Sequence, residues 1–101
     1  MGKLLLVILL LLPLLAVAAC ETTSGRARME ADLAAATGDV ERGKILYERS
    51  CSRCHPLRMP ASHSEEEWRF FIRKYGRRAR LSRPRQELVY AYLQHRLAEG
   101  G

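Results

Sequence analysis

Residues 51–55 read CSRCH, two cysteines separated by two residues and followed at once by a histidine. Four kinds of chemistry use such a cluster: a redox dithiol, a zinc site, one corner of an iron–sulfur cluster, and covalently attached haem. The leader, the cysteine count and the helix pattern of the remaining chain discriminate between these four.

The chain begins with a segment typical of a secretory signal. One cation, Lys3, precedes an apolar run at residues 4–15, and small residues follow as VAAC at 17–20. The run is shorter than the roughly 20 residues that a membrane-spanning helix needs, so a cleaved signal is favoured over a permanent anchor. We therefore expect a signal peptide at residues 1–19.

VAAC is similar to the lipobox of bacterial lipoproteins, in which the cysteine becomes the lipidated first residue of the mature chain. The resemblance implies that Cys20 is lipidated and tethers the protein to the inner or outer membrane, on the periplasmic side. Several acyl chains bury far more CH₂ groups than one myristoyl chain, so such a tether would be stable. The polar, alanine-rich residues that follow predict a flexible linker up to residue 37.

About 80 residues remain, which is barely enough for one self-sufficient core, and we expect a single domain at 38–101. With Cys20 lipidated, only Cys51 and Cys54 are left, so no disulfide framework is available. A zinc site would need two more ligands, but His63 and His95 lack the short spacing of paired zinc histidines. A thioredoxin-type dithiol requires a βαβ context, which the sequence does not predict.

CxxCH in an exported chain is the pattern of c-type haem attachment. Each thiol adds across one haem vinyl group, and the two intervening residues let both sulfurs reach neighbouring pyrrole rings. The next side chain then points at the iron. We predict one covalently attached haem c, with thioethers from Cys51 and Cys54 and with His55 as the proximal iron ligand. The alternative is a reactive or zinc-bound dithiol.

The region before and just after this motif predicts a helix and then an irregular loop. GDVERGKILYERS, residues 38–50, places apolar residues on neighbouring helical turns, with Asp39 as the expected cap. PLRMPASH, residues 56–63, has two prolines in eight residues and cannot form a regular helix.

Two further helices are predicted after the loop. SEEE at 64–67 matches a capping box, and this helix ends at Gly76. Its apolar stripe consists of Trp68, Phe71, Ile72 and Tyr75. The last helix begins near Ser82, accepts Pro84 in its first turn and runs through Leu97 to the terminal GG.

Residues 38–97 contain three features in succession: the segment GDVERGKILYERSCSRCH, a capped helix containing EEW, and a final helix containing AYL. In this order they resemble the small monohaem cytochrome c domain. The resemblance implies an all-α cytochrome c fold with three main helices packed around one covalently attached haem. In that family a glycine of the first helix makes room for an aromatic side chain of the last, and Gly43 and Tyr92 match those positions. A glycine inside a helix costs about 1 kcal/mol relative to alanine, which also favours a packing role for Gly43.

The second axial iron ligand departs from the family pattern. The family usually supplies a methionine near the end of the EEW helix, where this sequence has Tyr75. If Tyr75 binds the iron, phenolate donation lowers the reduction potential; if it does not, its ring packs over an open face of the haem. His63, eight residues after His55, and Met59, on a proline-bounded turn, are alternatives with short reach.

The net charge is +6, and the segment between Trp68 and Gln86 contains eight basic residues and no acidic one. The eight are Arg69, Arg73, Lys74, Arg77, Arg78, Arg80, Arg83 and Arg85. Such a field can hold the haem propionates, dock an acidic redox partner or lie on anionic lipid. Nucleic acid is not an expected partner of an exported lipoprotein.

Together these patterns predict a membrane-tethered c-type cytochrome that carries single electrons between redox partner proteins outside the cytoplasm. An independent enzyme is not expected, because about 80 residues around one haem leave no second pocket for an organic substrate. The alternatives are a haem-based sensor or small-ligand binder, and a haem subunit of a larger oxidoreductase.

Overall fold

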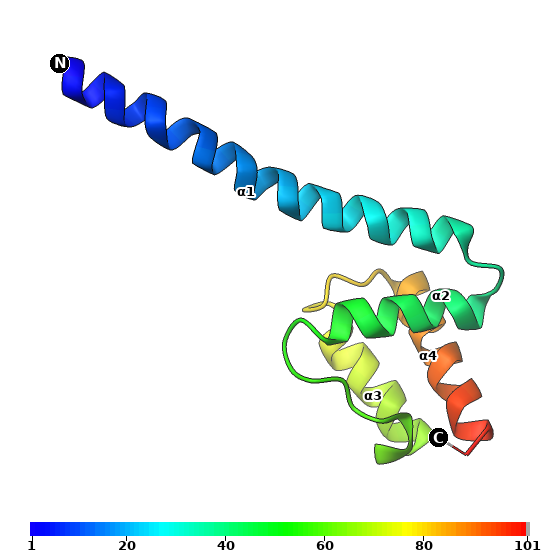
Figure 1. Ribbon diagram of the computed structural model, residues 1–101. Coiled ribbons are helices and arrows are strands. Elements are labelled where there is room, and N and C mark those ends of the chain that lie inside the picture. The colour runs from blue at the N-terminus through cyan, green and yellow to red at the C-terminus, as the bar shows by residue number, and fades with distance from the viewer. Residues whose placement is uncertain (101) are drawn as a thin grey trace. The chain divides into compact units, whose positions relative to one another are not determined.

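The computed structural model describes residues 1–100, except for the side chains of residues 12–23, and within this range it is helical with no strand (Figure 1). The elements are α1 (Gly2–Ala35), α2 (Asp39–Leu46), the π-helix η1 (Tyr47–Cys51), the 3₁₀ turn η2 (Pro60–Ser62), α3 (Glu65–Gly76) and α4 (Arg83–Ala98). The predicted all-α class is confirmed.

The chain divides into two units, Met1–Ala31 and Asp32–Gly101. The first unit belongs to α1, and its apolar side chains at positions 4–11 are exposed. Within the residues described, no helix has both the length and the hydropathy that crossing a membrane requires. The predicted lipidation site, Cys20, lies outside the described side chains.

The segment expected to be a flexible linker is helical as far as Ala35. Its alanine-rich composition explains this difference, because alanine has the highest helix propensity. The second unit also begins before residue 38, since Leu33 and Ala36 are buried. The backbone carbonyls of these two residues accept hydrogen bonds from the Arg42 guanidinium at 3.3 and 3.0 Å.

Helix α2 begins at Asp39, so the expectation that Asp39 caps this helix is wrong. Gly38 is the N-cap residue, and it has no side chain to bond the first turn. The Glu41 carboxylate instead turns back and accepts hydrogen bonds from the backbone N–H of Thr37 at 2.8 Å and its hydroxyl at 3.0 Å. Asp39 pairs with Arg42 within the helix, at 3.3 Å.

Helices α2 and α4 cross at Gly43. A Cβ atom at this position would lie 2.0 Å from the carbonyl oxygen of Leu88 and 2.8 Å from the Cβ of Tyr92. The helices therefore meet backbone to backbone, as predicted from Gly43 and Tyr92. The largest fully buried side chains are Leu46, Val89 and Leu93, which also come from α2 and α4.

Helix α3 has the predicted capping box. The Ser64 hydroxyl accepts a hydrogen bond from the Glu67 N–H at 3.2 Å, and the Glu67 carboxylate accepts one from the Ser64 N–H at 2.7 Å. The helix ends at Gly76 as predicted. At Gly76 the backbone lies against Gln86, whose side chain would be 2.7 Å from an added Cβ.

Helix α4 begins after Ser82, whose hydroxyl accepts a hydrogen bond from the Arg85 N–H, and Pro84 lies in the first turn as predicted. The Glu65 carboxylate of α3 accepts hydrogen bonds from the Tyr90 hydroxyl at 2.5 Å and from the Gln94 amide at 2.7 Å. These contacts fix α3 on α4 and so position the apolar stripe of α3.

Candidate functional site

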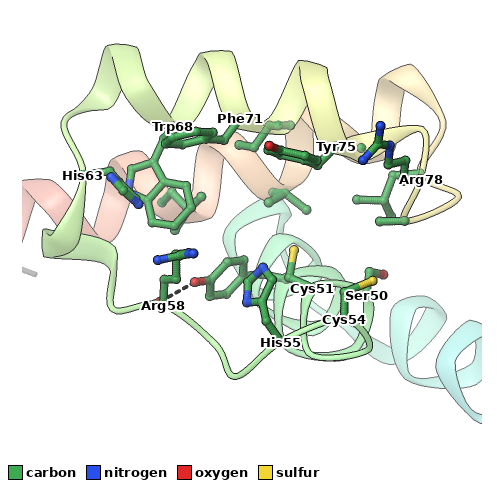
Figure 2. A pocket seen from close by; sticks show the side chains of 17 residues that line it. Ser50, Cys51, Cys54, His55, Arg58, His63, Trp68, Phe71, Tyr75 and Arg78 are labelled. Carbon is green, nitrogen blue, oxygen red and sulfur yellow. Dashed lines mark hydrogen bonds between the residues drawn. The ribbon is translucent and has the colours of Figure 1, made fainter.

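A pocket of about 480 Å³ lies in the second unit, with α3 on one side and the CSRCH segment on the other (Figure 2). This volume is within the 300–1,000 Å³ typical of cofactor and small-molecule sites. The predicted stripe of α3 faces this pocket, which is lined by Trp68, Phe71, Ile72 and Tyr75. The core residues Val89 and Leu93 also line the pocket, so the pocket and the core share a wall.

Cys51, Cys54 and His55 all line the wall opposite α3, and both thiols are free (Figure 2). Cys51 is the last residue of η1, where the helix has widened from the α to the π form. Such π segments rotate the following side chains around the helix axis and are frequent at functional sites. The structure thus brings together the three residues that the sequence predicted as one site.

The His55 imidazole is held in one orientation by its own turn. Its Nδ1 lies 2.7 Å from the backbone carbonyl oxygen of Pro56. A carbonyl oxygen only accepts hydrogen bonds, so Nδ1 is the donor in this contact, and in the neutral imidazole Nε2 then has a free lone pair. A hydrogen bond from Nδ1 to a backbone carbonyl is the usual arrangement for a histidine that binds a metal through Nε2.

Burial raises the pKa of the Cys51 thiol, and the neighbouring Cys54 raises it further. Redox-active dithiols have the opposite property, a lowered pKa that favours the thiolate. The zinc set considered from the sequence is not assembled: His95 does not line the pocket, and its Nε2 lies 3.2 Å from Oε1 of Glu99, the residue after α4. Among the described side chains, no three Cys, His, Asp or Glu residues gather in a metal-binding group.

Tyr75 lies on the α3 side of the pocket, across from Cys51 (Figure 2). Its ring stacks on Phe71 with centroids 6.2 Å apart, and Lys74 Nζ and the Arg78 guanidinium carbon lie 5.3 and 5.7 Å from its centroid. The side chain is 43% exposed. Tyr75 therefore forms part of the pocket wall and also contacts the basic surface, which is formed by the basic residues between Trp68 and Gln86.

The two alternatives to Tyr75 differ in their positions. His63 lines the pocket, with its ring 5.0 Å from Trp68 and 4.8 Å from Phe71, but Figure 2 shows it at one end, beyond Trp68. Met59 is 68% exposed and does not line the pocket. Of the three candidates, Tyr75 is the one that faces the cysteine wall.

The loop after the motif contributes Arg58, a pocket residue that the sequence did not indicate. The Tyr47 hydroxyl donates a hydrogen bond to the Arg58 carbonyl, and the Trp68 indole N–H donates one to the Pro60 carbonyl at 2.8 Å. Burial raises the pKa of Tyr47 to about 12, which keeps its hydroxyl a donor at physiological pH. Only the position of Arg58, three residues after His55, offered a signal in the sequence.

The basic segment is divided between the pocket and the surface. Arg78 lines the pocket, and the Arg69 guanidinium packs over the ring of Tyr90 at 4.2 Å. Exposed positions from this segment include Arg73, Lys74, Arg77, Arg80 and Arg83.

Comparisons with family models, with curated proteins and with solved structures give no match to this chain. The function of the pocket has to follow from its own residues.

Proposed function

We propose that the pocket holds one haem, joined covalently to Cys51 and Cys54, with His55 as the proximal iron ligand. The protein is then a monohaem c-type cytochrome that carries single electrons between redox proteins. The observation that carries this proposal is that two free thiols and an imidazole with an available Nε2 share one wall of a largely apolar pocket. When bound, the haem supplies the one-electron chemistry of its iron.

The residues present fit a haem. Aromatic and aliphatic side chains face the thiols across about 480 Å³, so a flat apolar ring system would find apolar contacts on the α3 side. A domain of this size buries little apolar surface by itself, and a buried macrocycle would add to its core. The crossing at Gly43 and Tyr92 supports the small cytochrome c fold.

The chain's own residues have three tasks in this function. His55 is oriented by its bond to Pro56, the apolar wall of α3 limits water, and the basic surface attracts an acidic redox partner. The same features suit a haem subunit of a larger oxidoreductase, in which the acidic partner is another subunit.

One observation favours a second candidate, a haem-based sensor or small-ligand binder. Tyr75 stands in place of the expected methionine and is 43% exposed. A wall residue so open to solvent gives small molecules a route to the α3 side of the pocket. Binding of carbon monoxide to the reduced protein separates this candidate from a plain electron carrier.

We also propose that Cys20 is lipidated and tethers the protein on the periplasmic side of a bacterial membrane, as VAAC indicates. In cell fractionation, Cys20→Ala should move the protein from the membrane to the soluble fraction. A mature protein whose intact mass still includes residues 1–19 would contradict this assignment.

Acid–acetone extraction tests the haem proposal. The colour of the protein made with a c-type maturation system should stay on the polypeptide, because acid–acetone does not break thioether bonds. The double variant Cys51→Ala, Cys54→Ala should lose the colour and much of its helicity. Ser52→Ala, an exposed change inside the same motif, is the matched control and should keep both. Haem in the organic layer from the unmodified protein would contradict the proposal.

A further inference from the structure

Two arginines line the pocket from opposite ends, Arg58 on the loop after the motif and Arg78 just beyond α3 (Figure 2). A haem carries two carboxylate groups, and a planar guanidinium matches a carboxylate with two parallel hydrogen bonds. We propose that Arg58, and not Arg78, binds the haem carboxylates. This inference rests on the proposed function, because it requires the haem to be attached at Cys51 and Cys54.

The order of side chains along the pocket gives the direction. Figure 2 shows Cys54, Cys51, His55 and Arg58 in succession along the wall opposite α3. In a haem, the two vinyl-bearing pyrrole rings lie on one side of the iron and the two carboxylate-bearing rings on the other. Attachment at the cysteines and an iron bond to His55 therefore direct the carboxylates past His55, toward Arg58.

The structure also prepares Arg58 for this role. Its backbone carbonyl accepts a hydrogen bond from the Tyr47 hydroxyl, and the nearby Pro60 carbonyl accepts one from the Trp68 indole N–H. The loop backbone is therefore tied both to η1 and to α3. In the described part of the chain, no carboxylate forms an ion pair with the Arg58 guanidinium. Arg58 is exposed and lines the pocket, so its guanidinium is available to an anionic ligand group there.

Arg78 has a different environment. Its guanidinium lies over the Tyr75 ring, 5.7 Å from the centroid, and Figure 2 places it at the Cys54 end of the pocket. That end would face the vinyl half of the haem, which carries no charge. Arg78 thus serves as a comparison for Arg58, with the same charge at the other end of the same pocket.

Chemical modification of the haem-loaded full chain tests the proposal. A carbodiimide and a small amine convert accessible carboxylates to amides. Digestion with trypsin and chymotrypsin then releases residues 50–53 and 54–57, which contain no Asp or Glu and remain joined by the haem. Any amide mass on this haem peptide therefore reports the haem carboxylates. Arg58→Gln should speed the modification of the haem carboxylates about three- to tenfold. This is the change in rate expected when one charge-assisted hydrogen-bonded pair at a partly exposed site is removed.

Three further variants complete the experiment. Arg58→Lys keeps the charge but lacks the planar fork, and should give an intermediate rate, which also serves as the test if Arg58→Gln does not mature. Arg53→Gln, an exposed arginine of the motif outside the pocket lining, should match the unmodified protein. An unchanged rate in Arg58→Gln, or faster modification in Arg78→Gln instead, would overturn the inference. Release of the colour from the unmodified protein by acid–acetone would instead overturn the proposed function.

Discussion

Gly43 is the residue on which the crossing of α2 and α4 depends. In Gly43→Ala the new Cβ would meet the Leu88 carbonyl oxygen at 2.0 Å, and this backbone atom cannot move unless α4 shifts. Overpacking of this kind costs about 1–3 kcal/mol, and contact with backbone places the change at or above the upper end. Urea unfolding followed by circular dichroism should show the loss. Gly25→Ala, at a helical glycine with open space around it, is the control and should not destabilise the protein. Equal urea midpoints for Gly43→Ala and Gly25→Ala would contradict the close crossing at Gly43.

Under the proposed function, Tyr75 is the candidate for the iron's second axial position, because it lines the pocket across from Cys51. Because Met59 is 68% exposed and outside the pocket lining, the ferric spectrum should lack the weak near-infrared band that marks methionine–iron ligation. Met59→Leu should therefore leave the spectrum unchanged. A band that is present in the unmodified protein and lost in Met59→Leu would return Met59 to the iron.

The same spectra of Tyr75→Phe separate the two candidate functions. A change to a high-spin haem would identify Tyr75 as a ligand, with a low reduction potential that Tyr75→Met should raise. An unchanged spectrum, together with ready carbon monoxide binding, would favour the sensor or ligand binder.

Among the elements, the helix ends that rest on local hydrogen-bonding signals were predicted correctly. Ser64 and Glu67 bond each other's backbone within four residues, and Ser82 with Pro84 defines the start of α4 in the same way. Neither interaction needs the rest of the fold, so the sequence alone could predict both.

Elements that depend on distant contacts were not predictable in this way. The placement of the loop at Arg58 involves a hydrogen bond from the Tyr47 hydroxyl to a carbonyl eleven residues away, and no local pattern indicated the π form of η1. The early start of the second unit depends on the burial of Leu33, which a propensity pattern does not reveal. The motif residues were predictable because their spacing is set by the ligand chemistry itself.

The contacts of α3 predict how stability depends on pH. The pKa of Glu67 is lowered by the Ser64 backbone N–H and hydroxyl, and the pKa of Glu65 by the Tyr90 hydroxyl and the Gln94 amide. A carboxylate with a lowered folded-state pKa stabilises the fold above its unfolded pKa, and this contribution is lost as pH falls through the folded value. Stability should therefore fall as pH drops below 4.5, the ordinary value for both groups.

Substitution of both carboxylates checks this dependence. In the double variant Glu65→Gln, Glu67→Gln, unfolding midpoints measured from pH 7 down to acid should fall less steeply than in the unmodified protein. Glu66→Gln lies on the same turn but outside the capping box, and should keep the original slope. Parallel curves for all three proteins would show that these hydrogen bonds do not set the acid sensitivity.

At the scale of the whole molecule, the exposed cations of α3 and the following turn should govern partner encounter. Their summed field acts over about 8 Å at physiological salt and contributes little to folding. Arg73→Glu with Arg77→Glu should slow electron exchange with an acidic copper protein by about tenfold at low salt and flatten its salt dependence. Arg26→Glu with Arg28→Glu makes the same charge change in the first unit and should have a smaller effect. Equal effects would mean that only net charge matters.

The proposed function requires covalent attachment of the haem, and the intact mass of the mature protein after thiol alkylation measures this attachment. The sulfurs of Cys51 and Cys54 in thioether bonds are no longer thiols, so they do not form the thiolate that iodoacetamide alkylates. The protein should therefore carry the added mass of one haem and take up no alkyl group at either position. A chain without added haem mass, in which both thiols are alkylated, would show that no haem is attached to Cys51 and Cys54.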